Sequence, residues 1–272
     1  MDEITLKALA KINLGLDVVR RREDGYHEVR MIMQTIHLYD LLEIQKIREP
    51  EIQIVSNLSF LPVNENNLVY KAARLLQEEF ALTDGISVKL TKRIPVGKPV
   101  AAGMAGGGTD AAAMLYAMNQ LYDLGLSRRE LMKRGVQIGA DVPYCLMRGT
   151  ALAEGIGEKL TQLPPMIKCP VLIAKPSISV STKFVYQNLK LDEQTNHPDI
   201  DALMKDIREK DFDGVCAHMG NVLESVTIPN YPVIAEIKQQ MMRSGAKASM
   251  MSGSGPTVFG IFDNRDKMAA AA

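Results

Sequence analysis

Residues 103–109 form a glycine-rich segment whose composition is typical of an anion-binding loop. The segment reads Gly-Met-Ala-Gly-Gly-Gly-Thr, and Asp110 and a run of strong helix formers follow it. Glycine lets the backbone approach a ligand closely and adopt positive φ without a steric cost. A helix that starts here directs unpaired N–H groups and the positive end of its dipole back toward the segment. We therefore expect residues 103–109 to bind phosphate.

Two general nucleotide-binding patterns fit this segment poorly. A P-loop requires a lysine after its last glycine, and Thr109 occupies that position. The dinucleotide fingerprint matches residues 106–111 formally. However, the acid at the right distance downstream, Glu130, falls at a helix start instead of the end of a second strand. The simplest alternative is a tight turn ahead of a closely packed helix.

Other polar residues have types and spacing that suit chemistry. Alternation along an extended strand puts Lys11 and Asn13 on one face, which is either a solvated face or part of a site. Asp141 precedes a Val-Pro pair, and proline pushes the residue before it into an extended conformation. Asp141 is therefore expected where a helix has just ended. Its carboxylate could act as a base, or it could only cap a helix or form an ion pair.

Three further segments present polar or aromatic groups in turns. Tyr26 and His27 follow an Asp-Gly turn, which taken alone is an ordinary surface hairpin. Residues 176–186, which include Thr182 and Tyr186, follow a strand that ends at a proline. Residues 252–257 read Ser-Gly-Ser-Gly-Pro-Thr just before the last apolar strand, where a hairpin turn is the alternative.

The elements that must position these residues mix without a regular βαβ rhythm, so the pattern predicts an α+β fold. Leu163-Pro164-Pro165 is the best candidate linker, and we predict an N-terminal domain at 1–163 and a C-terminal domain at 164–272. Short segments rich in β-branched residues predict strands, and apolar stripes behind capping signals predict helices. The strands are expected at 4–8, 42–46, 52–55, 86–90, 171–175 and 258–262, and the helices from 68, 110 and 127, at 199–210 and at 233–244.

Composition excludes several classes of function. The 272 residues hold 32 basic and 32 acidic side chains, so no global field favours nucleic acid or an anionic membrane. The three cysteines have no metal-type or redox-type spacing, which is typical of buried thiols in a reducing compartment. The N-terminus is acidic where a signal peptide is basic, and no apolar stretch approaches the roughly 20 residues that span a bilayer. We expect a cytoplasmic protein.

The segment 99–109 closely resembles the glycine-rich loop of the GHMP small-molecule kinases, the superfamily named for galactokinase, homoserine kinase, mevalonate kinase and phosphomevalonate kinase. Residues 11–16, 139–144 and 252–257 resemble other motifs of that superfamily, in the right order. Residues 24–27 and 176–186 resemble segments of one branch, whose members phosphorylate a cytidine diphosphate polyol in non-mevalonate isoprenoid synthesis. The chain departs from the pattern after Ile-Pro-Val, where four extra residues, 97–100, leave open whether Lys92 or Lys98 faces the nucleotide.

The resemblance implies a two-domain GHMP kinase fold, with a ribosomal-S5-domain-2-like ATP-binding domain and a ferredoxin-like substrate-binding domain. It implies ATP and Mg²⁺ as cofactors, with Thr109 touching the metal ion. Asp141 is then the base that accepts a proton from the acceptor's 2-hydroxyl, and Lys11 lies near it. The residues expected at the nucleotide are Pro99, Val100, Ala101, Ala102, Gly103, Met104, Ala105, Gly106, Gly107, Gly108, Thr109 and Asn67; those expected at the polyol or its cytosine are Asn13, Tyr26, His27, Thr182 and Tyr186.

The resemblance thus implies a small-molecule substrate, no nucleic-acid or membrane partner, and a monomer or weak homodimer. Four alternatives stay open. They are another GHMP kinase of the homoserine or mevalonate class, a nicotinamide-dependent oxidoreductase, a nucleic-acid binder with a shared N-terminal fold, and a catalytically inactive nucleotide sensor.

Overall fold

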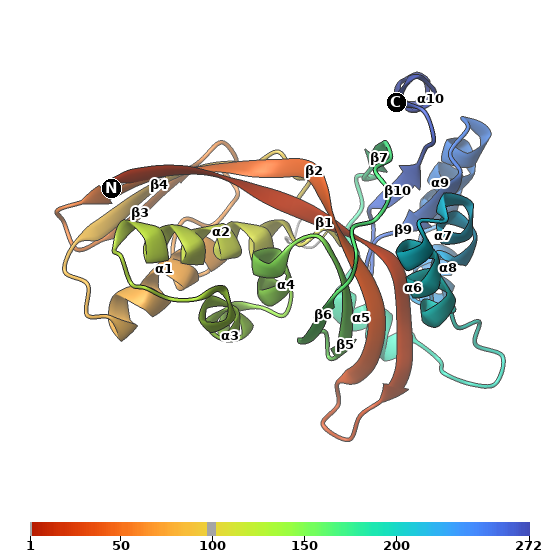
Figure 1. Cartoon of the computed structure of the whole chain (residues 1–272), viewed down its shortest axis with the longest axis horizontal. Coiled ribbons are helices and arrows are strands. Elements are labelled where there is room, and N and C mark those ends of the chain that lie inside the picture. The colour runs from red at the N-terminus through yellow and green to blue at the C-terminus, as the bar shows by residue number, and fades with distance from the viewer. Residues whose placement is uncertain (1, 97–101) are drawn as a thin grey trace. The chain divides into compact units, whose positions relative to one another are not determined.

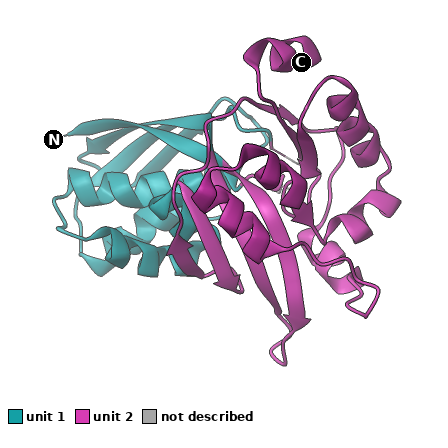
Figure 2. Cartoon of the chain, turned by 45° about the vertical axis from the view of Figure 1, so that its right-hand side comes forward, with its two compact units in different colours: residues 1–10, 36–95, 105–148 teal, residues 11–35, 96–104, 149–272 magenta. Residues whose placement is uncertain are grey.

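The computed structural model describes residues 2–96 and 102–272. By its internal contacts the chain divides into two compact units, and each consists of several segments (Figure 2). Unit 1 comprises residues 1–10, 36–95 and 105–148, and unit 2 comprises 11–35, 96–104 and 149–272. The long strands β1 (Glu3–Arg21) and β2 (His27–Ile47) contribute to both units. The predicted division at 163/164 stays a prediction.

Unit 1 is a sheet with helices on one face (Figure 1). Its strand order is β3-β4-β2-β1, where β3 (Ile52–Ser56) runs parallel to β4 (Gly85–Thr91), and β4 is antiparallel to β2. Inward positions of β4 are apolar and fully buried, as alternation requires. The helices are α1 (Leu68–Glu79), α2 (Gly106–Leu121), α3 (Arg128–Ile138) and α4 (Val142–Met147).

The helix starts in unit 1 follow the capping signals in two cases and depart from the prediction in a third. The Asn67 side chain accepts from the N–H of Val69, and Ser127 and Glu130 form a complete capping box. Helix α2 was expected to open near Asp110 but begins at Gly106, so three glycines form its first turn. Close packing overrides their low helix propensity, because Gly108 and the following residues as far as Leu115 are buried.

Unit 2 contains the remaining strands and helices. The N-terminal half of β2 pairs with β5 (Thr150–Gly155), and β5 pairs with β6 (Lys159–Gln162). Strand β1 pairs in parallel with the short β8 (Gly220–Asn221). A separate antiparallel sheet has the order β7-β10-β9, formed by Val171–Ala174, Val258–Ile261 and Ala248–Met251. The helices are α5 (Thr182–Asn188), α6 (Ile200–Glu209), α7 (Phe212–His218), α8 (Glu224–Asn230), α9 (Val233–Arg243) and α10 (Arg265–Ala271).

The observed elements confirm the α+β prediction and every predicted strand position, but β1 is much longer than the predicted 4–8. Residues 10–16 of β1 are buried without interruption, so the polar–apolar alternation that reveals a half-buried strand is missing there. Within residues 2–96 and 102–272, no helix combines the length and apolar character needed to cross a bilayer.

One ion pair of unit 2 makes the stability of the protein depend on pH. His218, at the end of α7, places Nδ1 2.6 Å from Oδ2 of Asp206 on α6. This hydrogen bond, aided by the charge of Asp206, raises the pKa of His218 above its ordinary value. The folded state therefore binds the imidazole proton more tightly than the unfolded state does, whose pKa is about 6.5. The resulting stabilisation is complete below this unfolded-state pKa and is lost as pH rises through the folded-state pKa of His218.

We therefore expect His218→Gln to lower the melting temperature at about pH 5.5 but not at about pH 9. The effect is modest because the imidazole is partly exposed. Thermal unfolding of both proteins at the two pH values measures it. An equal loss of stability at both pH values contradicts the assigned ion pair.

Candidate active site

The described part of the predicted phosphate loop combines left-handed backbone with a helix start whose N-cap residue has no capping side chain. Gly103 has φ +77°, and Ala105, the N-cap residue of α2, has φ 56° and ψ 31°. The N-cap residue Ala105 provides no side-chain capping hydrogen bond, so the first N–H groups of α2 are oriented for an anion. The predicted residues Pro99, Val100 and Ala101 lie outside the described residues.

A second loop holds the first half of the phosphate loop in place within unit 2. The Ser252 hydroxyl donates to the carbonyl of Gly103 at 2.8 Å, and the backbone N–H of Lys11 donates to the carbonyl of Met104 at 3.2 Å. A Cβ at Gly103 would lie 2.1 Å from the Ser252 carbonyl oxygen. The predicted packing of residues 252–257 over the phosphate loop is therefore confirmed at Gly103. Ser252 itself was not among the predicted site residues.

Lys11 and Asn13 form a buried polar pair on β1. Lys11 Nζ donates to Asn13 Oδ1 at 2.7 Å, and the two residues are 5% and 0% exposed. Their predicted common face is thus confirmed, and the alternative of a solvated face is wrong. An ammonium held by a neutral amide in the protein interior keeps donors for an anionic group.

Asp141 lies beside the first turn of α2 in unit 1. It occupies the N-cap position of α4, three residues after α3 ends at Ile138, but its side chain makes no capping hydrogen bond. A Cβ built at Gly108 would lie 3.3 Å from Cβ of Asp141. The simple capping role is therefore excluded, and the carboxylate is brought next to the predicted phosphate site. Lys11 belongs to unit 2, so its predicted proximity to Asp141 stays a prediction.

The residues predicted to recognise cytosine belong to unit 2, and the structure brings two of them together. The rings of His27 and Tyr186 have centroids 5.1 Å apart and are tilted by 45°. Partial burial, aided by the charge of Arg21, lowers the pKa of His27, which favours the neutral imidazole that can both donate and accept. The hydroxyls of Thr182 and Ser254 are 2.8 Å apart, whereas Tyr26 is 62% exposed.

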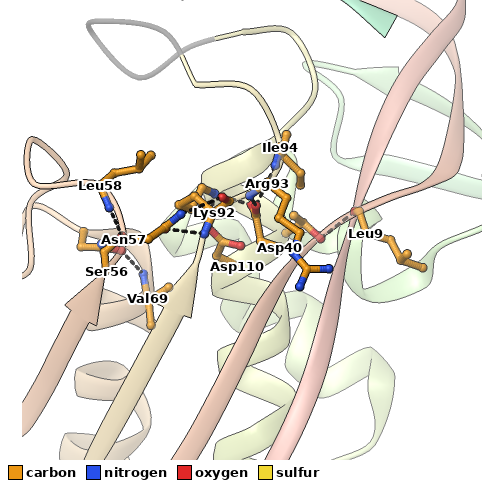
Figure 3. A network of polar contacts seen from close by, with 12 residues as sticks. Leu9, Asp40, Ser56, Asn57, Leu58, Val69, Lys92, Arg93, Ile94 and Asp110 are labelled. Atoms are coloured by element: carbon orange, nitrogen blue, oxygen red, sulfur yellow. Dashed lines mark hydrogen bonds and ion pairs between the residues drawn. The ribbon is translucent and has the colours of Figure 1, made fainter. Parts of the chain in front are cut away.

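A buried ionic network beside α2 was missed by the sequence analysis (Figure 3). The Lys92 ammonium, just after β4, contacts carboxylate oxygens of Asp40 on β2 and Asp110 on α2. All three side chains are at most 4% exposed. We call these three residues the loop-end network. A lone aspartate at an inward position of an apolar strand is the only local signal that could have revealed it.

The charges of the loop-end network strongly affect one another. Burial disfavours the ammonium, but the two carboxylates outweigh this effect and raise the pKa of Lys92. Burial raises the pKa of Asp110 well above its usual range, against the attraction of Lys92. Between the two lysines left open by the sequence, Lys92 is thus engaged by buried carboxylates, and Lys98 lies outside the described residues.

The predicted metal ligand, Thr109, is 3% exposed and donates its hydroxyl hydrogen to the carbonyl of Leu9 at 2.8 Å. The hydroxyl oxygen keeps a lone pair, so it fits a hard cation such as Mg²⁺. Across residues 2–96 and 102–272, no group of three or more His, Cys, Asp or Glu side chains is placed to hold a metal ion. Mg²⁺ commonly keeps several waters and binds through substrate phosphates, which suits such a site. Asn67, predicted at the nucleotide, uses its side chain to cap α1 and to donate to the Pro62 carbonyl.

Comparison with known proteins places the chain among kinases. Residues 67–149 match the family model described as GHMP kinases N terminal domain, and residues 203–272 match GHMP kinases C terminal. The chain is 61% identical to the 4-diphosphocytidyl-2-C-methyl-D-erythritol kinase of Lachnospira eligens, over 99% of this chain and 92% of the relative. It is 50% identical to the enzyme of that name from Acetivibrio thermocellus, over 100% of this chain and 94% of the relative.

Solved structures agree with this placement. A crystal structure of 4-(cytidine 5'-diphospho)-2C-methyl-D-erythritol kinase matches with a TM-score of 0.85 and 31% identity, over 99% of this chain and 94% of that one. The homoserine kinase of Cytophaga hutchinsonii shares the fold, with a TM-score of 0.78 and 20% identity over 100% of this chain and 88% of that one. The chain therefore belongs to the GHMP kinases and, within them, to the family of 4-diphosphocytidyl-2-C-methyl-D-erythritol kinases.

This membership confirms the predicted two-domain GHMP kinase fold and the predicted enzyme class, an ATP-dependent small-molecule kinase. The alternative of a nicotinamide-dependent oxidoreductase was therefore wrong. The two matched segments fall inside the predicted domains 1–163 and 164–272.

Proposed function

We propose that this protein transfers the γ-phosphoryl group of ATP to the 2-hydroxyl of 4-diphosphocytidyl-2-C-methyl-D-erythritol. The observation that carries the proposal is the short distance between Asp141 and the first turn of α2, where a Cβ added at Gly108 would lie 3.3 Å from Cβ of Asp141. The Asp141 side chain makes no capping hydrogen bond, and a triphosphate is expected at this helix end. The names of the relatives supply the identity of the acceptor. The reaction belongs to the non-mevalonate route to isoprenoid precursors.

In this proposal the protein supplies alignment and charge neutralisation, which is most of what phosphoryl transfer requires. Backbone N–H groups of residues 102–109 hold the triphosphate at the start of α2. Asp141 accepts the proton of the tertiary 2-hydroxyl as its oxygen attacks the γ-phosphorus, and ADP leaves. Lys11 stabilises the negative charge that develops on the attacking oxygen. Thr109 is the proposed protein ligand of Mg²⁺, which neutralises phosphate charge when bound.

The cytidine end of the acceptor is assigned to unit 2. Tyr26 stacks on cytosine, and His27, Thr182 and Tyr186 surround its polar edge and the opposite face. Asn13 is proposed to contact the polyol. This assignment is supported by the ring contact between His27 and Tyr186 and by the exposure of Tyr26, whose ring is available to a planar ligand.

The acceptor requirement can be tested directly. ADP release by the purified protein with 4-diphosphocytidyl-2-C-methyl-D-erythritol, homoserine or mevalonate is expected to be substantial with the first compound alone. Turnover of homoserine or mevalonate at a comparable kcat/KM would favour the other GHMP classes.

Tyr26→Ala is expected to raise KM for the cytidine acceptor by about tenfold or more, with a smaller effect on kcat, because base stacking is worth about 1–3 kcal/mol. The change should cost little stability since the side chain is exposed. Steady-state kinetics with the acceptor varied measures it. Tyr116→Ala is the matched control, because Tyr116 is also exposed, at 44%, but lies on α2. An unchanged KM in Tyr26→Ala removes Tyr26 from the cytosine site.

We further propose that the enzyme works in the cytoplasm as a monomer or weak homodimer, without nucleic acid. Equal numbers of basic and acidic residues and three free cysteines support this assignment.

A further inference from the structure

The loop-end network joins the two places where the chain enters and leaves the phosphate loop. The chain approaches the loop through Lys92, Arg93 and Ile94, and residues 106–109 at its other end form the start of α2. Lys92 Nζ is 2.5 Å from Asp110 Oδ2 on α2. A Cβ at Gly106 would lie 3.4 Å from the same ammonium, so Lys92 lies directly against the start of α2.

The approach to the loop is fixed on neighbouring strands by several hydrogen bonds (Figure 3). Asp40 Oδ1 accepts from the backbone N–H groups of Arg93 and Ile94, at 2.6 and 2.8 Å. Asn57 brackets the backbone of Lys92, since its Oδ1 accepts from the Lys92 N–H at 2.8 Å and its Nδ2 donates to the Lys92 carbonyl at 3.1 Å. The position of Lys92 is thus determined independently of α2.

The loop-end network is poorly suited to serve stability alone. It buries two carboxylates against one ammonium, and Asp110 Oδ1 has no hydrogen-bond partner among the described residues. Buried ion pairs of this kind are often worth no more than well-packed apolar residues, because desolvation offsets their attraction. In some proteins such groups instead fix a defined geometry.

We propose that Lys92 is a positioning residue which, through Asp40 and Asp110, holds the two ends of the phosphate loop at a fixed separation and so prearranges the N–H groups of α2 for a nucleoside triphosphate. The inference rests on the proposed function. Prearrangement raises affinity because the start of α2 does not have to be ordered at the moment of binding.

The test compares two variants that remove the same charge. Asp110→Ala and Asp110→Asn both remove the carboxylate, but asparagine keeps an oxygen acceptor for Lys92. We expect Kd for a fluorescent ATP analogue to be about tenfold higher in Asp110→Ala than in Asp110→Asn. This factor corresponds to the conformational entropy lost when about one residue is ordered. KM for ATP should follow Kd, while KM for the acceptor should be unchanged.

Asp206→Ala is the matched control, because Asp206 is also a buried, paired aspartate but lies on α6 and contacts His218. It should lose stability and keep wild-type affinity for the analogue. Should Asp110→Ala not fold, Asn57→Ala decides, since it loosens the approach to the loop without changing any charge. The inference is overturned if Asp110→Ala and Asp110→Asn bind the analogue with equal affinity. Where Asp110→Ala does not fold, it is overturned if a folded Asn57→Ala binds the analogue with wild-type affinity. A wild-type protein that binds no ATP analogue instead overturns the proposed function.

Discussion

Replacing Asp141 with asparagine is expected to lower kcat by about 10²–10⁴-fold while the affinity for ATP stays close to that of the wild type, because a positioned base contributes about that much. Asparagine has nearly the same shape but cannot accept the proton of the attacking hydroxyl. The fold should tolerate the change, since the Asp141 side chain does not cap α4. Steady-state turnover, together with equilibrium binding of an ATP analogue, separates the two effects.

Asp199→Asn is the matched control for this prediction. Asp199 also lies at a helix N-cap, but its side chain accepts from the N–H of Ala202 on α6 at 2.9 Å. Asparagine is an equally good capping residue, so both stability and turnover should be retained. Wild-type kcat in Asp141→Asn would remove this carboxylate from the mechanism. A large loss of ATP affinity would make it part of the nucleotide site instead.

Replacing Gly103 with alanine is expected to lower the free energy of unfolding by about 2–4 kcal/mol. Two causes act together. Gly103 has φ +77°, a region that favours glycine, and the new Cβ would lie 2.1 Å from the backbone oxygen of Ser252. A backbone oxygen cannot rotate away as a side chain can. The loop formed by residues 252–257 therefore has to move.

The same substitution should damage catalysis, because the phosphate loop is displaced with its neighbour. A displacement of about 1 Å can cost roughly 10²-fold in rate, and we expect at least this loss in kcat/KM for ATP. Chemical denaturation measures the stability, and steady-state kinetics measure the activity. Both are recorded below the melting temperature of the variant.

Gly125→Ala isolates the cost of positive φ. Gly125 follows α2 with φ +67°, and a Cβ there would meet nothing within 4 Å. This variant should lose only about 1 kcal/mol and keep full activity. If Gly103→Ala were no worse than Gly125→Ala, the close packing of Ser252 on the phosphate loop would be wrong.

The sequence alone determined the features that depend on neighbouring residues. The glycines at 103 and 106–108, the capping box at Ser127 and the α+β mixture of elements could all be predicted, because turn, cap and periodicity signals act over a few residues. The ordered motifs also indicated the kinase class before any contact was known.

Only the tertiary structure decided which distant residues meet. Lys92 contacts residues 52 and 18 positions away, and Ser252 contacts Gly103 from 149 positions away. The sequence also did not predict the start of α2 at Gly106, because close packing there overrode the low helix propensity of glycine. It did not predict the full length of β1, because burial of residues 10–16 removed the polar–apolar alternation. Pairings of this kind arise from the packing of whole elements, and a contact between elements leaves no periodic pattern in either segment by itself.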